Sequence, residues 1–185
     1  MQGSRFVEDI IHRQIKDEEL QRLLVLHSEC VARKSVDLAR RLGINDPERL
    51  QFIFDAAMLH DIGIVKCNAP SIHCHGKLPY ICHGVAGAEI LRAEGLDERY
   101  CRICERHTGS GLTAKEIAER DLPLPRQDFV PETLEEKIVC YADKFFSKSG
   151  DPAKEKSLER VEASMCRHGE ASLERFLTLK AEVDP

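Results

Sequence analysis

The stretch MLHDIG at residues 58–63 places two metal-binding side chains next to each other at the end of an apolar segment. Neighbouring residues project about 100° apart on a helix, so His60 and Asp61 reach one ion together only near a helix end. Gly63 is expected to supply that end, because glycine often terminates helices. The stretch therefore predicts a metal site at a helix terminus, completed by ligands from other parts of the chain.

The segments around this stretch have the periodicity of amphipathic helices almost throughout. Asp17, Asp46 and Asp97 precede three of these segments in the position of helix caps, and Thr113 with Glu116 has the pattern of a capping box. We expect irregular backbone at residues 65–82 and 122–131. Helices are expected at 7–15, 17–42, 46–60, 83–91, 97–107, from 113 onward, 132–146 and 154–180, the last with a kink at Gly169.

The sequence shows no strand-like alternation and no internal repeat, which predicts an all-α protein. A chain of 185 residues is long enough for one domain with a substantial core. We expect a single domain over residues 1–185, with its core at about 20–147. A C-terminal helix within 152–180 is expected to pack on that core.

The composition limits the partners that the protein is expected to have. Its net charge of −5 argues against a nucleic-acid polymer as the main partner. No apolar run approaches the roughly 18–20 residues that cross a membrane, and residues 1–6 do not begin a signal peptide. We therefore expect a cytoplasmic protein without membrane association. The oligomeric state is left open, with a homo-oligomer among the alternatives.

Cysteine and histidine residues outside the MLHDIG stretch leave two alternatives open. In a reducing compartment the thiols are expected to be free and partly buried. The other alternative is a structural zinc site, although Cys101 and Cys104 lie in a helical segment without the turn of a zinc knuckle. The remaining residues of this kind lie in the stretch 67–82, whose role is left open: Cys67, His73, Cys74, His75 and Cys82.

Six ionisable side chains fall on apolar faces or at the ends of predicted helices. A polar or charged group that faces a core costs several kcal/mol unless it is paired or ligated. Each has an ordinary structural explanation of its own, such as a hydrogen-bonded core histidine, but six such explanations need six independent partners. A shared metal site accounts for all of them together. The six candidates are His27, His60, Asp61, His83, His107 and Asp143.

The ligand types indicate the kind of ion. Imidazole and carboxylate groups suit divalent transition metals, namely Fe, Mn, Zn, Ni or Co, better than Ca or Mg. One ion takes about four to six ligands, so six side chains with water are enough for two ions. In two-metal hydrolases the ions lie about 3.5–4 Å apart, a distance that one carboxylate spans, and Asp61 is the expected bridge.

The order His27, His60-Asp61, Asp143 resembles the H…HD…D signature of the HD-domain metal-dependent phosphohydrolase superfamily, and LHDIG at 59–63 resembles its HDIG subgroup. HGVAGAEIL at 83–91 and RHTG at 106–109 are similar to the segments that carry two extra histidines in two-metal members. Those members include HD-type diadenosine tetraphosphate hydrolases and HD-GYP cyclic dinucleotide phosphodiesterases. Residues 130–139 resemble a small prokaryotic HDIG branch. The resemblance covers roughly residues 20–147.

The resemblance implies a helical HD-domain bundle that hydrolyses a phosphate ester of a nucleotide or another small phosphorylated molecule. A metal-bound hydroxide would attack the phosphorus. The GYP element is absent, which disfavours cyclic dinucleotides as substrates. The alternative is a non-catalytic or regulatory module that binds metal and nucleotide. The implied ligands are His27, His60, Asp61 and Asp143 for the first ion, and Asp61, His83 and His107 for the second.

Three cations near the predicted ligands are candidates for contact with the substrate. Lys66 follows the HD pair closely and is predicted, together with Asp61, as a catalytic residue; it could also bind a phosphate as a point charge. Arg106 and Lys144 each adjoin a predicted ligand and are predicted to bind substrate. Each of the three has the alternative of an ordinary solvated surface cation.

Overall fold

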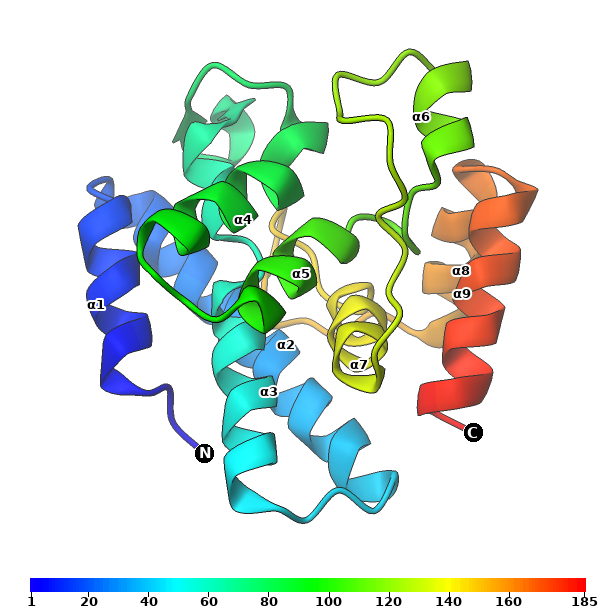
Figure 1. The fold of residues 1–185 in the computed structure, drawn as a ribbon, viewed down its shortest axis with the longest axis horizontal. Coiled ribbons are helices and arrows are strands. Elements are labelled where there is room, and N and C mark those ends of the chain that lie inside the picture. Colours follow the sequence, from blue (N-terminus) through cyan, green and yellow to red (C-terminus); the bar gives the residue numbers. More distant parts are fainter.

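Nine α-helices make up most of the protein in the computed structural model, which describes all 185 residues (Figure 1). The predicted all-α fold is confirmed, and helix positions agree with the expected segments except near the C-terminus. The helices are α1 (Arg5–Gln14), α2 (Glu18–Arg41), α3 (Pro47–Leu59), α4 (His83–Ala93), α5 (Glu98–Arg106), α6 (Ala114–Glu119), α7 (Leu134–Asp143), α8 (Leu158–Arg167) and α9 (Glu170–Val183).

Side-chain caps begin the helices where the sequence predicts them. Asp17 accepts a hydrogen bond from the backbone N–H of Leu20 at 2.8 Å at the start of α2. Thr113 and Glu116 form the expected capping box of α6. Such caps satisfy backbone donors that would otherwise lack partners, and each contributes about 1 kcal/mol.

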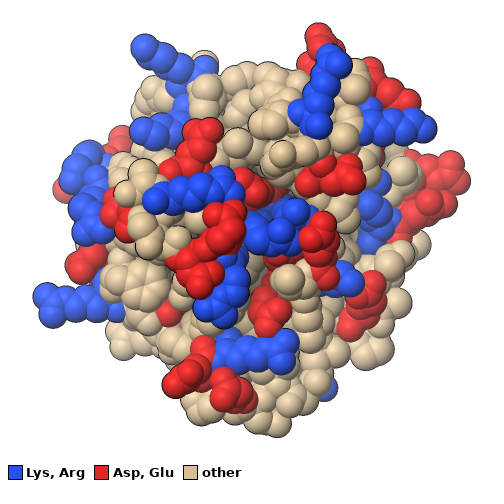
Figure 2. Space-filling view, in the orientation of Figure 1, with Lys and Arg blue, Asp and Glu red and all other residues tan.

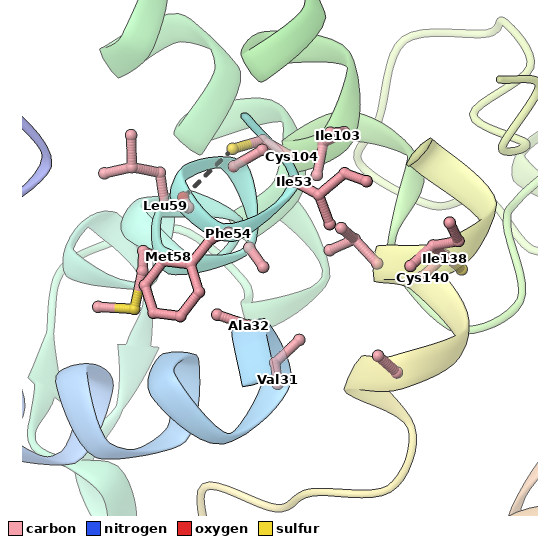
Figure 3. Close-up of a cluster of buried hydrophobic side chains, with 14 of the residues drawn as sticks. Val31, Ala32, Ile53, Phe54, Met58, Leu59, Ile103, Cys104, Ile138 and Cys140 are labelled. Atoms are coloured by element: carbon pink, nitrogen blue, oxygen red, sulfur yellow. Dashed lines mark hydrogen bonds between the residues drawn. The ribbon is translucent and has the colours of Figure 1, made fainter. Parts of the chain in front are cut away.

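The hydrophobic core lies where α2, α3, α5 and α7 meet (Figure 3). Val31 of α2, Ile53 of α3, Ile103 of α5 and Ile138 of α7 are almost completely buried there. Each such side chain contributes about 1.5–3 kcal/mol through burial. Five of the six candidate ligands belong to these same helices or follow them, and only His83 belongs to another helix, so the core also positions the candidate site.

A small antiparallel pair of strands corrects the expectation that residues 65–82 contain no strand. β1 (Asn68–Ala69) pairs with β2 (Cys74–His75). Two-residue strands are too short to show an alternating pattern, which is why the sequence did not reveal them. Three 3-10 helices complete the segment: η1 (Ile62–Lys66), η2 (Pro70–Ile72) and η3 (Tyr80–Cys82).

The cysteines agree with the expectation of free, partly buried thiols. All eight are free thiols, and none belongs to a group of side chains close enough to share a metal ion. Burial raises the pKa of Cys67 to about 12 and that of Cys74 to about 11, so these thiols stay protonated at neutral pH. They therefore act as small buried side chains of the irregular segment.

The expectation of one kinked C-terminal helix is wrong, because the chain breaks at Gly169 into two helices. Gly169 has a φ of 116°, which no helix accommodates. The helices α8 and α9 form a hairpin, and α9 packs on α7 through Phe176, whose ring stacks on that of Tyr141 with 5.3 Å between centroids. This hairpin lies beside α6 in Figure 1.

Charged side chains of both signs are interspersed on the face shown in Figure 2, so this face has no broad area of one sign. None of the helices combines the length and the apolar character that crossing a bilayer requires.

Candidate metal centre

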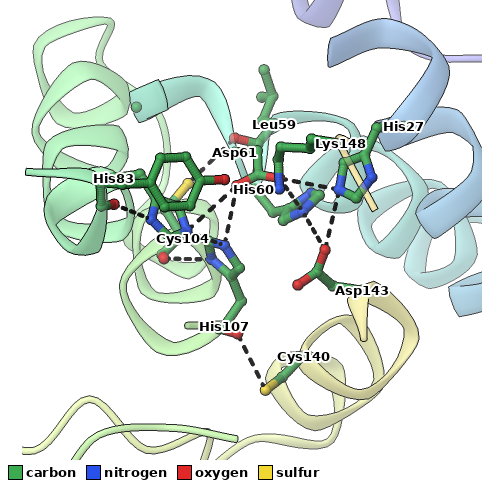
Figure 4. A network of polar contacts seen from close by, with 12 residues as sticks. His27, Leu59, His60, Asp61, His83, Cys104, His107, Cys140, Asp143 and Lys148 are labelled. Atoms are coloured by element: carbon green, nitrogen blue, oxygen red, sulfur yellow. Dashed lines mark hydrogen bonds and ion pairs between the residues drawn. The ribbon is translucent and has the colours of Figure 1, made fainter. Parts of the chain in front are cut away.

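The structure brings all six predicted ligands together at the centre of the bundle (Figure 4). His27 comes from the middle of α2, and His60 and Asp61 follow α3. His83 begins α4, His107 follows α5, and Asp143 ends α7. Every one of them is at most 8% exposed, so the cluster is embedded in the protein.

The first group of ligands joins α2, α3 and α7. Nε2 of His27 lies 3.1 Å from Oδ2 of Asp61 and 3.1 Å from Oδ1 of Asp143. Nε2 of His60 lies 2.9 Å from the same oxygen of Asp61 and 3.3 Å from the same oxygen of Asp143. Two imidazole nitrogens and two carboxylate oxygens therefore converge on one small volume.

The second group uses the other oxygen of Asp61. Oδ1 of Asp61 lies 3.5 Å from Nε2 of His83 and 3.3 Å from Nε2 of His107. Figure 4 shows Asp61 between the two groups, with His83 and His107 on one side and His27 and Asp143 on the other. One carboxylate thus faces two ligand sets, one with each oxygen.

Backbone carbonyl groups fix the orientation of three of the imidazoles. Nδ1 of His83 donates to the carbonyl of Tyr80 at 2.7 Å, and Nδ1 of His107 donates to that of Cys104 at 2.7 Å. Nδ1 of His60 donates to the carbonyl of Ala57 in the same way. This arrangement directs each Nε2 into the cluster, which is typical of metal-ligating histidines.

The pair His83 and His107 shows that the cluster suits a cation. Burial and then the neighbouring His107 lower the pKa of His83 to about 3, and burial also lowers the pKa of His107. Both rings are therefore neutral at pH 7, with the proton on Nδ1. Their unprotonated Nε2 atoms lie only 2.9 Å apart, so two lone pairs face each other. A bound cation would relieve that repulsion.

Asp61 gives a second indication that a cation fits. Both of its oxygens are buried, and neither accepts a hydrogen bond of good geometry, although histidine nitrogens surround them and Nζ of Lys148 lies 2.5 Å from Oδ2. Burial alone would raise the pKa of Asp61, but the charges of His60 and Lys148 hold that pKa well below its usual range. The carboxylate is therefore ionised, and neutral imidazole with carboxylate is a donor set that suits a divalent transition metal.

Gly63 has a role different from the predicted one. Its φ is not positive, and it lies inside η1 rather than ending α3. A Cβ atom at this position would lie 2.0 Å from the carbonyl oxygen of His83 and 2.3 Å from the backbone nitrogen of Gly87. Glycine is therefore needed so that η1 can pass directly against the start of α4, which sets the distance between Asp61 and His83.

The comparison with protein families agrees with this geometry. The model of the family described as HD domain matches residues 24–147, a range that contains all six ligands. The chain belongs to the HD domain family. The predicted resemblance to the HD-domain phosphohydrolase superfamily is thereby confirmed.

Two relatives match more than two thirds of this chain. The chain is 40% identical over 133 residues to a tRNA (cytidine(56)-2'-O)-methyltransferase of Picrophilus torridus, which covers 72% of this chain and 34% of that protein. It is 38% identical over 127 residues to an uncharacterized protein of Methanocaldococcus jannaschii. This match covers 69% of this chain and 67% of that protein. The chain spans about a third of the length of the methyltransferase relative.

A solved structure has the same fold as this HD domain. It is the HD domain of the phosphodiesterase PgpH of L. monocytogenes, with a TM-score of 0.54 and 15% sequence identity. The similarity covers 96% of this chain and 97% of that one. It therefore extends over the C-terminal hairpin as well as the segment that the family model matches.

The three predicted substrate cations lie in different places relative to the HD-domain ligands. Lys144 adjoins the cluster: its Nζ lies 2.6 Å from Oδ2 of Asp143 and donates to the carbonyl of His107 at 2.8 Å. Arg106 instead donates to the carbonyl of Val130 at 2.6 Å. Lys66 is exposed on η1 and lines neither of the two cavities beside the cluster.

Lys148 is a residue of the site that the sequence analysis missed. Its Nζ lies 2.5 Å from Oδ2 of Asp61, and its side chain is only 12% exposed. Burial disfavours its charge, but Asp61 raises the pKa of Lys148 above its usual value. The only signal in the sequence is its position five residues after the predicted ligand Asp143, just beyond the match to the HD domain.

Two cavities adjoin the candidate ligands. One of about 440 Å³ extends from His83 and His107 to α6 and α9. Another of about 400 Å³ lies on the side of Lys156. Lys144 and Lys148 line both cavities, so these two cations lie at the boundary between the cavities, next to Asp143. A third cavity, of about 780 Å³ and formed mainly by α1 and α2, contains none of the six ligands.

Proposed function

We propose that the protein is a metal-dependent phosphohydrolase that cleaves a phosphate ester of a small molecule, such as a nucleotide, at a two-metal site. The observation that carries the proposal is the position of Asp61, whose two oxygens face two separate ligand sets. A carboxylate that bridges two ions is suited to hydrolysis, because paired ions stabilise charge on both the attacking and the leaving oxygen.

The residues of the chain contribute binding and charge. Lys144 and Lys148 present ammonium groups at the edge of the ligand cluster, where they would hold the oxygens of a phosphate group. Asp61 and Asp143 would hold the ions, and when bound the ions would supply Lewis acidity and an activated water. The catalytic role predicted for Lys66 is not part of this proposal, because Lys144 and Lys148 lie nearer to the ligands.

The names of the relatives do not decide the activity of this chain. Two of these relatives are named as tRNA methyltransferases, and this chain spans only about a third of their length. The ligand cluster, in contrast, lies wholly within the chain and within the match to the HD domain. The cluster therefore supports the proposed reaction more directly than the names of the relatives do.

The two-metal site predicts the metal content of the protein. After loading with Mn²⁺ and gel filtration, we expect about two ions per chain by elemental analysis. His83→Ala should reduce this to about one, because Asp61 and His107 alone supply too few ligands for the second ion. His75→Ala removes an exposed histidine outside the cluster and should leave two. One ion in the unmodified protein would contradict the two-metal arrangement.

The pH dependence of metal binding follows from His60. Burial opposes its charge, but the carboxylates of Asp61 and Asp143 raise the pKa of His60 to about 9 in the metal-free protein. His60 must lose this proton to become a ligand, so binding at pH 7 should release about one proton. The affinity should then rise about tenfold for each pH unit up to about 9. Calorimetry in two buffers of different ionisation enthalpy measures the proton release, and a release of zero would refute this assignment.

Turnover separates an enzyme from a binding module. We expect the Mn²⁺-loaded protein to hydrolyse p-nitrophenyl phosphate or bis(p-nitrophenyl) phosphate, and chelation followed by gel filtration to abolish the reaction. Full metal content without hydrolysis of these esters or of a panel of nucleotides would favour the alternative, a regulatory module that binds metal and nucleotide.

A further inference from the structure

The cavity of about 440 Å³ continues from the metal centre to a wall that the C-terminal hairpin helps to form. Arg175 of α9 lines this wall and donates to Oε1 of Glu116 at 2.7 Å and to the carbonyl of Gly111 at 3.1 Å. These contacts join α9 to α6. The C-terminus of α6 adds Arg120, and the turn between α8 and α9 adds His168.

The positive charge of this wall has few partners in the protein. Arg120 is exposed and makes no ion pair and no side-chain hydrogen bond. Nε of Arg175 is buried without a hydrogen-bond partner. The cavity has two acidic residues in its lining: Asp143 belongs to the metal ligands, and Glu116 is held by Arg175. This wall of the cavity therefore carries more positive than negative charge, and the guanidinium of Arg120 has no partner in the protein.

We infer that this wall, and Arg120 in particular, binds a second phosphoryl group of the substrate, so that the protein acts on small molecules with two separate phosphoryl groups. The inference rests on the proposed function, because the first phosphoryl group occupies the metal centre. A guanidinium binds a phosphate through two parallel hydrogen bonds. The cavity also lies within the range of about 300–1,000 Å³ that holds small ligands.

Two phosphonates that resist hydrolysis test the inference independently of turnover. Propylphosphonate carries one phosphonate group, and propane-1,3-bisphosphonate carries two. In titration calorimetry with Mn²⁺-loaded protein, we expect the bisphosphonate to bind at least about tenfold more tightly. In Arg120→Met this preference should fall by about tenfold. Because Arg120 is exposed and unpaired, the variant should fold normally.

Arg126→Met is the matched control. Arg126 is an exposed arginine six positions later that does not line the cavity, so the variant loses the same charge without losing the contact. The Arg126→Met variant should bind the bisphosphonate more tightly than propylphosphonate by the same factor as the unmodified protein. A preference that arises only from chelation of the ions would be the same in Arg120→Met and Arg126→Met.

The outcomes distinguish this inference from the proposed function. Equal affinity for the two phosphonates in the unmodified protein would overturn the second phosphate site, as would an unchanged preference in Arg120→Met. Either result leaves hydrolysis at the metal centre standing. Failure of both phosphonates to bind, together with the absence of turnover, would overturn both.

Discussion

Asp61→Asn is expected to lower the metal content from about two ions per chain to less than one, and kcat/KM by about 10³-fold or more. Asp61 contributes to both ligand sets, with Oδ2 near His27 and His60 and Oδ1 near His107. An amide has no charge and only one oxygen, so it cannot hold two ions. Elemental analysis and ester hydrolysis measure the two effects.

Asp55→Asn is the matched control, because Asp55 is another buried aspartate and lies outside the cluster. Its Oδ1 accepts a hydrogen bond from the backbone N–H of Ser4 at 2.8 Å, which ties the N-terminus to α3. This variant should keep about two ions per chain even if its stability falls. Retention of two ions by Asp61→Asn would show that Asp61 is not a bridge.

Gly63→Ala is expected to lower the free energy of unfolding by about 3 kcal/mol, at the upper end of the usual cost of overpacking. The added methyl group would lie 2.0 Å from the carbonyl oxygen of His83, a backbone atom that cannot rotate away. To relieve the clash, η1 and α4 must separate. Separation moves His83 away from Asp61, so the second ion should bind more weakly as well. Urea unfolding and metal titration measure the two effects.

Gly3→Ala serves as the control for the loss of a glycine. A Cβ atom at Gly3 would have no neighbour closer than 3.9 Å, so this substitution should leave both stability and metal affinity nearly unchanged. If Gly63→Ala were as stable as Gly3→Ala, the close approach of η1 to α4 would not be a constraint of the folded protein.

The clustering of the six candidate ligands could be predicted from the sequence, because each is a polar residue on an apolar helix face or at a helix end. His27 interrupts an apolar stripe, and His83 and His107 stand at helix ends. Polar groups at such positions need a common explanation, and the structure gathers them into two groups that share Asp61.

The cations beside the candidate site were harder to predict, because side chains of residues that are neighbours in the sequence can point in different directions. Arg106 adjoins His107, yet it turns toward the carbonyl of Val130. Lys148 reaches Asp61 only because the chain folds back after α7. The direction of a side chain after a helix end depends on long-range packing, which a periodic pattern does not describe.

The two helices of the C-terminal region also could not be predicted from the periodicity of the sequence. The apolar stripe runs through Val161, Met165 and Phe176, so its period continues across Gly169 and predicts one helix. The break depends on the positive φ of Gly169. Since the hairpin brings Arg175 to the cavity, the anion-binding wall could be recognised only in the folded chain.

The first ligand set also connects distant parts of the chain. His27 and Asp143 are 116 positions apart, and their side chains meet at 3.1 Å. An ion held by both would be a reversible cross-link between the two ends of the segment that matches the HD domain, residues 24–147. The protein has no disulfide bond that could serve this purpose. A ligand that binds only the native chain suppresses its unfolding. An ion bound at this site would therefore stabilise the native arrangement of the whole bundle and not the site alone.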